Sequence, residues 1–350
     1  MAVLTMLRLT DGAEDCVFIE SMRSRRTGRT RRYLSPAVGL LLLSALWAFA
    51  SLRAELFPAF GTESLPPAAR QAVLLCVFAA VAASVAKARR VEFPHGRRAW
   101  ACAGIGLGLF VVPAALVACA EGWVPVLDRV AVFSLISVFA VVLEPYLQDN
   151  EPRPGKASLA GALAAVAGIL FLLGLDIPRS FRAGAALCAL LAAALGIAAT
   201  YCLAVRLARS VAGHSSLPMA AQASSASAAC FAAAAAFAPH NAWHWSAVPV
   251  QLLGLFVIDI PALFLLFWLM RRLAASRITA RFLFGPLFTI LAGIALEPTS
   301  LPVRAWLGIA LLAGGAGWLA FAPAEKGEVE ELDPMNVINA RSPRRQPPCR

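Results

Sequence analysis

Two hydrophobic stretches of this chain share one pattern, and that pattern decides the fold. The first is SLAGALAAVAGILFLLG (residues 158–174), with Gly161 and Gly168; the second is AWLGIALLAGGAGWLAF (residues 305–321), with Gly308 and Gly315. The two glycines are seven residues apart in both copies, close to two helical turns, so each pair lies on one helix face. A repeat of about 140 residues in an apolar chain indicates duplicated halves, a common architecture of membrane transporters.

The residues ahead of the two stretches match as well. Pro145 and Glu151 precede the first copy, and Pro286 and Glu297 precede the second. The matching glutamates are expected to end their helices. The copies differ in spacing, because Pro145 and Glu151 lie closer together than Pro286 and Glu297. We therefore expect the helix that ends near Pro145 to be shortened or broken.

Composition indicates an all-α integral membrane protein. The 350 residues are 60% hydrophobic and 15% charged, whereas soluble domains are about 45–50% apolar and about 25% charged. The net charge of +11 does not indicate nucleic-acid binding, because the basic residues form short runs between apolar segments and not one continuous face. The eight cysteines are scattered, without a CxxC, and fit small apolar positions. No metal site or cofactor is expected.

The apolar segments predict about ten transmembrane helices, each near the length of about 20 residues that a bilayer requires. Residues 1–33 form a basic tail, in which Met22 is an alternative start, and residues 323–350 form a charged, Pro-rich tail expected to be disordered. The predicted spans are residues 35–53, 69–87, 99–119, 127–147, 157–175, 183–205, 217–238, 248–270, 278–296 and 303–322.

Basic residues predict the orientation of these spans. We predict an inner-membrane protein with both termini in the cytoplasm, because this orientation places the larger of two sets of basic residues on the cytoplasmic side. The inside set is Lys87, Arg89, Arg90, Arg97, Arg98, Arg153, Lys156, Arg206, Arg209, Arg271, Arg272, Arg277 and Arg281; the outside set is Arg53, Arg70, Arg129, Arg179, Arg182 and Arg304. Five spans per half make the repeat an inverted one, with halves 34–176 and 177–322.

On these residues the chain resembles the EamA group of the drug/metabolite transporter superfamily. In the second half the resemblance rests on the run from Ser276 through Pro286, Glu297, Gly308 and Gly315. In the first half it rests on Pro145, Glu151, Gly161 and Gly168, with Trp47 in the first helix. The resemblance implies two inverted five-helix repeats, a central cavity, and transport of a small metabolite, such as export of an amino acid.

Asp259 is the sharpest candidate for a functional residue. It lies near the middle of the eighth predicted span, where an acid costs about 2.5–3.5 kcal/mol on insertion. Pro261 follows and frees backbone groups that can line a cavity. Asp259 either binds a substrate amine or a coupled proton, or is a structural carboxyl within the bundle.

Other candidates are polar or aromatic residues in apolar spans. Glu144 is either a cavity carboxylate or an interfacial residue at a helix end. Gln222 and Ser225 place polar groups on the seventh span, where they either line the cavity or join helices. Tyr201 and Trp47 either face the cavity or pack.

The remaining features concern helix geometry and the class of protein. Pro145, Pro261 and Pro286 are predicted hinges between the halves. Gly104 and Gly108 form a small-xxx-small pair for helix packing, and the repeat glycines Gly161, Gly168, Gly308 and Gly315 are also predicted to pack helices. We find no nucleophile–base pair or P-loop, so we expect no enzyme. The prediction is a secondary transporter working by alternating access; an integral membrane enzyme and a non-transporting scaffold are the alternatives. A sugar-phosphate carrier would need basic residues inside the cavity, which the spans nearly lack.

Overall fold

The protein is an all-α, multi-pass membrane protein. The structure is a computed structural model that describes residues 36–50, 65–148, 156–173, 180–210, 216–238, 248–296 and 302–321. In these ranges eight helices are long and apolar enough to cross a membrane, and a shorter apolar helix covers Pro36–Ala50. No strand occurs in the described ranges. The fold class predicted from composition is therefore confirmed, and every predicted span contains a helix.

Several spans are built from more than one helical segment. The third span joins α5, η1 and α6; the eighth joins α11, η4 and α12; the ninth joins α13 and α14. In chain order the labelled elements are α4 (Pro67–Ala88), α5 (Arg97–Gly106), η1 (Leu107–Val111), α6 (Val112–Ala120), α7 (Val126–Leu147), α8 (Lys156–Leu173), α9 (Phe181–Ser210), α10 (Leu217–Ala236), α11 (Val248–Gly254), η4 (Leu255–Asp259), α12 (Ile260–Arg272), α13 (Ala275–Thr279), α14 (Arg281–Leu296) and α15 (Val303–Phe321).

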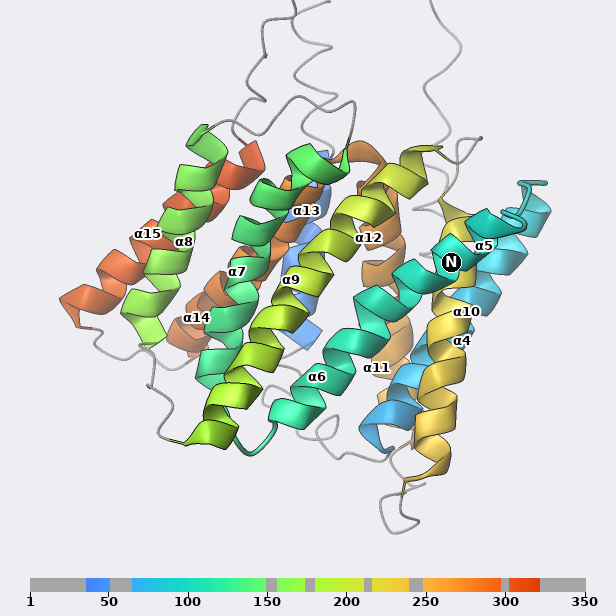
Figure 1. The fold of residues 1–350 in the computed structure, drawn as a ribbon, viewed down its shortest axis with the longest axis horizontal. Coiled ribbons are helices and arrows are strands. Elements are labelled where there is room, and N and C mark those ends of the chain that lie inside the picture. Colours follow the sequence, from blue (N-terminus) through green and yellow to red (C-terminus); the bar gives the residue numbers. More distant parts are fainter. Residues whose placement is uncertain are drawn as a thin grey trace, which may run out of the picture.

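Two helix pairs form the ends of the bundle. Figure 1 shows α8 beside α15 at one end and α4 beside α10 at the other, and both pairs are in extensive contact. Between them lie α7, α9, α12 and α14, with α7 packed along α9. The third span packs on α9 through α6. The core runs through these central helices, where Phe267 of α12 and Tyr201 of α9 are fully buried, and it extends to Phe78 of α4.

The four repeat glycines meet in the contact between α8 and α15. A Cβ on Gly168 would lie 2.6 Å from the carbonyl oxygen of Gly308, and a Cβ on Gly315 would overlap the carbonyl oxygen of Gly161. Gly161 meets Gly315 and Gly168 meets Gly308, so residue numbers rise along α8 where they fall along α15. The two helices are therefore antiparallel. At Gly168 and Gly315 the close approach requires glycine, because a methyl group there would meet backbone and not a movable side chain.

The third and eighth spans each contain one π-helical turn. In the third span η1 follows Gly106 and precedes Pro113; in the eighth, η4 follows Gly254 and precedes Pro261. Proline has no N–H to donate to the carbonyl four residues earlier, so the backbone there widens into a π turn. Asp259 is the last residue of η4.

The helix that ends near Pro145 is neither short nor broken, contrary to the spacing argument. α7 runs for 22 residues with Pro145 in its last turn, where the loss of one N–H bond does not interrupt the helix. Pro286 also lies inside a continuous helix, α14. The ninth span is interrupted at Ala280, between α13 and α14. Glu151, Glu297 and the tails 1–33 and 323–350 lie outside the described residues.

The glycine pair predicted in the third span is wrong in one member. No described heavy atom lies within 4 Å of a Cβ placed on Gly104, so this residue does not mediate a close contact. Gly108 packs on Thr200 of α9, and Gly106 approaches the backbone of Ala223 in α10. The close contacts of this span therefore lie on Gly106 and Gly108, on the faces toward α10 and α9.

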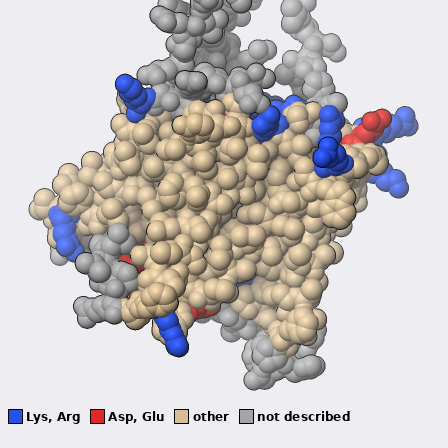
Figure 2. Space-filling view, viewed as in Figure 1, with Lys and Arg blue, Asp and Glu red and all other residues tan. Residues whose placement is uncertain are grey.

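Charged side chains lie at the edges of the bundle. Figure 2 shows Lys and Arg gathered along the upper edge, with a broad face of other residues beneath them. In the same view the upper edge carries the ends of α9 and α12 and the start of α5, which bear basic residues. A broad face with few charges beneath a basic edge is suited to the hydrocarbon region of a bilayer.

Candidate functional site

A buried arginine lies at the centre of the bundle, within a cage of aromatic rings. Arg281, the first residue of α14, is only 6% exposed. Its guanidinium carbon lies 3.9 Å from the ring centre of Trp47, 4.7 Å from that of Phe282 and 5.1 Å from that of Tyr201. A cation over aromatic faces is attracted by the negative charge density above each ring. We refer to these four residues as the Arg281 cage.

Three spans supply the cage. Trp47 comes from the first helix, Tyr201 from α9, and Arg281 with Phe282 from the start of α14. Tyr201 is fully buried, and its hydroxyl accepts a hydrogen bond from Nη2 of Arg281. Its ring also meets Phe282 edge-on, with centroids 6.0 Å apart. Two of the predicted contact residues, Trp47 and Tyr201, are thus brought together by an arginine that sequence reasoning had placed elsewhere.

Most of the donors of Arg281 have no acceptor within the described part of the chain. Nε and Nη1 are buried and have no hydrogen-bond partner there, and these two nitrogens carry most of the N–H groups of the guanidinium. Aromatic faces attract the charge but give N–H groups no strong acceptor. A buried donor without a partner costs about 1–3 kcal/mol. A ligand that brings an acceptor into the cage would recover part of this cost.

Glu144 has a structural position, and it is neither interfacial nor in the cage. The side chain is 2% exposed, one turn from the end of α7. Its Oε1 accepts the backbone N–H of Ala275 (2.9 Å) and its Oε2 that of Ser276 (3.4 Å), so it caps the first turn of α13. From the same α7, Ser137 donates to the carbonyl of Thr279 (2.8 Å). Glu144 therefore fixes α13 against α7.

The corner before α13 is held from α9 as well. Nη2 of Arg209 donates to the carbonyl of Leu273 at 2.9 Å. Because α13 and α14 form one span, the anchoring of α13 determines where α14 begins. The position of Arg281 thus depends on contacts made by Glu144, Ser137 and Arg209.

Asp259 is half-buried at the end of the π turn of the eighth span. Its side chain or backbone engages in an interaction, so Asp259 is not without a partner. Its place beside Pro261, in a widened turn of a membrane span, is a reason to expect a functional role.

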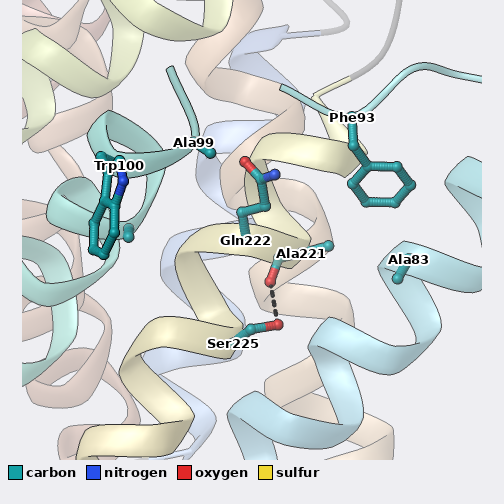
Figure 3. Close-up of a pocket in the computed structure, with 8 residues that line it drawn as sticks. Ala83, Phe93, Ala99, Trp100, Ala221, Gln222 and Ser225 are labelled. Carbon is teal, nitrogen blue, oxygen red and sulfur yellow. Dashed lines mark hydrogen bonds between the residues drawn. The ribbon is translucent and has the colours of Figure 1, made fainter. Parts of the chain in front are cut away.

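Gln222 and Ser225 lie in a different pocket, formed by the ends of α4, α5 and α10. The pocket has a volume of about 350 Å³, and Figure 3 shows Gln222 between Trp100 and Phe93. Nε2 of Gln222 donates to the carbonyl of Pro94 at 2.8 Å, and Ser225 donates to the carbonyl of Ala221 at 2.8 Å. Neither residue belongs to the Arg281 cage, so the expectation of one shared cavity is wrong for this pair.

Sequence reasoning missed Arg281 and Phe282. Arg281 was counted among the cytoplasmic loop residues, although it falls within the predicted span 278–296. The cause is α13, which begins at Ala275 and adds about 9 Å of helix before Arg281 at 1.5 Å per residue. An arginine inside a predicted span boundary, followed by Phe282 and Phe284, was the signal available.

Comparison with known proteins identifies the fold and no family. No model of a known protein family and no curated protein matches the chain. Among solved structures, one described as "Crystal structure of protein" has a TM-score of 0.65 and 20% sequence identity, and covers 83% of this chain and 99% of its own. At this identity the match shows the fold alone: a crystallised protein has a similar arrangement of helices over nearly its whole length.

Proposed function

We propose that the protein is a secondary transporter of a small metabolite that works by alternating access between two inverted five-helix repeats. The observation that carries the proposal is the pairing of repeat glycines between α8 and α15. Gly161 and Gly308 are equivalent positions of the two copies, and so are Gly168 and Gly315. Gly161 meets Gly315 and Gly168 meets Gly308, which is the exchange that a twofold axis across two antiparallel helices produces.

Other contacts support the same symmetry. The second and seventh spans, α4 and α10, pair at the far end of the bundle as the fifth and tenth do at this end. The third span packs on the sixth through Gly108 and Thr200. Correspondingly, the first helix packs on the eighth span, because a Cβ on Gly39 would lie 3.1 Å from the Trp268 ring. Each contact thus has a counterpart in the other half.

The interrupted spans also occupy matching positions. Within the described residues, each half has a π turn between a glycine and a proline in its third helix. Discontinuous helices near the bilayer midplane are the usual place for substrate and ion sites in transporters with inverted repeats. Pro113 and Pro261, and the interruption at Ala280, are therefore better hinge candidates than Pro145 and Pro286. The Arg281 cage lies at the interface between the halves, as Trp47 and Arg281 come from different copies.

The orientation follows from the same proposal. We place the basic edge in Figure 2 toward the cytoplasm, and the proposed topology puts both termini on that side. Moving Arg281 from the loops to the core leaves this assignment unchanged, because the other inside residues still outnumber the outside ones. The architecture is also the one that the resemblance to the EamA group implies, and we propose export of an amino-acid-like metabolite on that basis.

A toxicity screen tests transport even while the substrate is unidentified. Cells with and without the gene are exposed to growth-inhibiting amounts of amino acids and their analogues. We expect the gene to protect against at least one compound, and the labelled compound to leave preloaded cells faster when the gene is present. The purified protein in liposomes should exchange the same compound. Liposomes that exchange it no faster than protein-free ones would contradict transport and favour a scaffold.

A further inference from the structure

Resting on the proposed transport function, we propose that Arg281 binds a carboxylate group of the substrate, and that Trp47 is the wall of the cage that moves to admit it. In the cage a buried positive charge and N–H donors without an acceptor occur on the same side chain. Three properties of the site support the proposal: its uncompensated charge, its single cation, and the exposure of one of its walls.

The charge of Arg281 is not balanced by the described residues. Among them Arg281 forms no ion pair, and its polar contact is the neutral hydroxyl of Tyr201. Burying a cation without a counter-ion in an apolar core is unfavourable, and membrane spans keep such residues mainly where they act on a ligand or a proton. An anion that accepts from Nε or Nη1 would supply both the missing charge and the missing acceptor.

The single cation selects a monoanion. Among the residues that the structure describes, Arg281 is the one basic residue that is buried. A carboxylate would be neutralised by one guanidinium. A phosphate dianion would retain a net negative charge inside a wall of aromatic rings, which is unfavourable in such surroundings. The apolar rings in turn suit the carbon skeleton next to a carboxylate, so the expected ligand is a small organic acid or amino acid.

Trp47 is the wall with room to move. The side chain is 39% exposed, whereas Tyr201 is fully buried and bonded to the guanidinium, and Phe282 adjoins Arg281 in the same helix. Trp47 belongs to the first helix, so it can leave the cage without disturbing α9 or α14. Its ring lies closest to the guanidinium and covers it in this structure. Binding of a carboxylate therefore requires that Trp47 give up its place over Arg281.

The test compares each carboxylate with its uncharged isostere. The probes are L-amino acids beside their carboxamides, benzoate beside benzamide, and phenyl phosphate as the dianion. Binding to the purified full-length protein in detergent is measured by the shift in thermal unfolding temperature and by calorimetric titration. The variants are Arg281→Gln, Arg281→Lys and Trp47→Ala. The matched control is Arg272→Gln, because Arg272 also stacks on a tryptophan, Trp268 at 4.7 Å, but at the exposed end of α12.

We expect at least one carboxylate to raise the unfolding temperature of the wild type and of Arg272→Gln, while its amide does not. Arg281→Gln should lose the response, and Arg281→Lys, which keeps the charge but not the planar fork, should bind about tenfold more weakly. Trp47→Ala should bind at least as tightly as the wild type, since the ring no longer competes. Size-exclusion chromatography establishes that each variant is folded. If Arg281→Gln does not fold, Arg281→Lys still tests the proposal.

The proposal is overturned if no carboxylate of the panel binds, if amides or phenyl phosphate bind equally well, or if Arg281→Gln keeps the response. Weaker binding by Trp47→Ala would refute the role of Trp47 as a movable wall. Failure of transport is distinguishable: a carboxylate that binds through Arg281 but is not exchanged by liposomes contradicts the transporter and leaves the site. Exchange that is equal in Arg281→Gln and wild type contradicts the site and leaves the transporter.

Discussion

The glycine contact between α8 and α15 offers a sharp test of the fold, because α15 carries its own control. In Gly315→Ala the new Cβ would lie 2.5 Å from the backbone nitrogen of Ala165 and 2.9 Å from its Cα, and closer still to the carbonyl of Gly161. In Gly314→Ala, one residue earlier, no described heavy atom lies within 4 Å of the new Cβ. The two variants add the same methyl group to the same helix.

The expected difference follows from these distances. Ordinary van der Waals contact begins at 3.4 Å, so Gly315→Ala must push the helices apart by about 1 Å. Backbone cannot rotate away as a side chain can, and overpacking of this kind costs about 1–3 kcal/mol. Gly314→Ala should be neutral or stabilising by up to about 1 kcal/mol, from helix propensity alone. The two variants should therefore differ by about 1–4 kcal/mol in free energy of unfolding.

The assay is unfolding of the purified protein in mixed micelles with increasing sodium dodecyl sulfate, followed by circular dichroism. Gly168→Ala serves as a second test from the other helix, because its Cβ would lie 2.5 Å from the backbone nitrogen of Leu312. It should be destabilised to a similar extent as Gly315→Ala. A difference of less than about 0.5 kcal/mol between the free energies of unfolding of Gly315→Ala and Gly314→Ala is no larger than the usual departure from additivity. Such a result would refute the close antiparallel contact.

Three further predictions concern the interior. Arg281→Met should change the free energy of unfolding by no more than about 1 kcal/mol, because removing an unpaired buried charge offsets the lost ring contacts; a larger loss in thermal unfolding would make Arg281 a structural residue. Glu144→Ala should destabilise by about 2–4 kcal/mol, since two buried N–H groups at the start of α13 lose their acceptor, and Glu144→Gln by less; equal stability of Glu144→Ala and wild type contradicts the cap. Gly106→Ala should be destabilised relative to Gly104→Ala in the same detergent assay, because only Gly106 meets backbone of the neighbouring helix; indistinguishable midpoints would refute this contact.

The helices could be predicted from sequence because they depend on local composition. A bilayer requires about 20 apolar residues per span whatever their partners are, so the ten segments were recognisable one at a time. The glycine pairs were also visible, since their spacing fixes them on one face of each helix. Gly104 shows the limit of such reasoning: it has the spacing of a packing residue, yet no described neighbour approaches it.

The roles of single polar residues could not be predicted in the same way. Glu144 could be a cavity carboxylate or an interfacial residue at a helix end, but α13 packs against that end and makes the carboxylate a cap. Gln222 and Ser225 could either line the cavity or join helices, and α10 packs beside α4 and places them in a separate pocket. In each case the deciding fact is which helix lies alongside, and that depends on residues far away in the sequence.

Sequence by itself determined that the chain is helical, enters the membrane many times, and carries a repeated glycine pattern, because these properties follow from composition and period. Tertiary structure alone decided that the glycines of the two copies face each other, and that Arg281 lies inside an aromatic cage and not in a loop. The physical reason is that the burial of a side chain and its contacts depend on which helices pack against each other. An arginine near the end of a span is at the surface or in the core according to what packs around it, and here Trp47, Tyr201 and Phe282 enclose it.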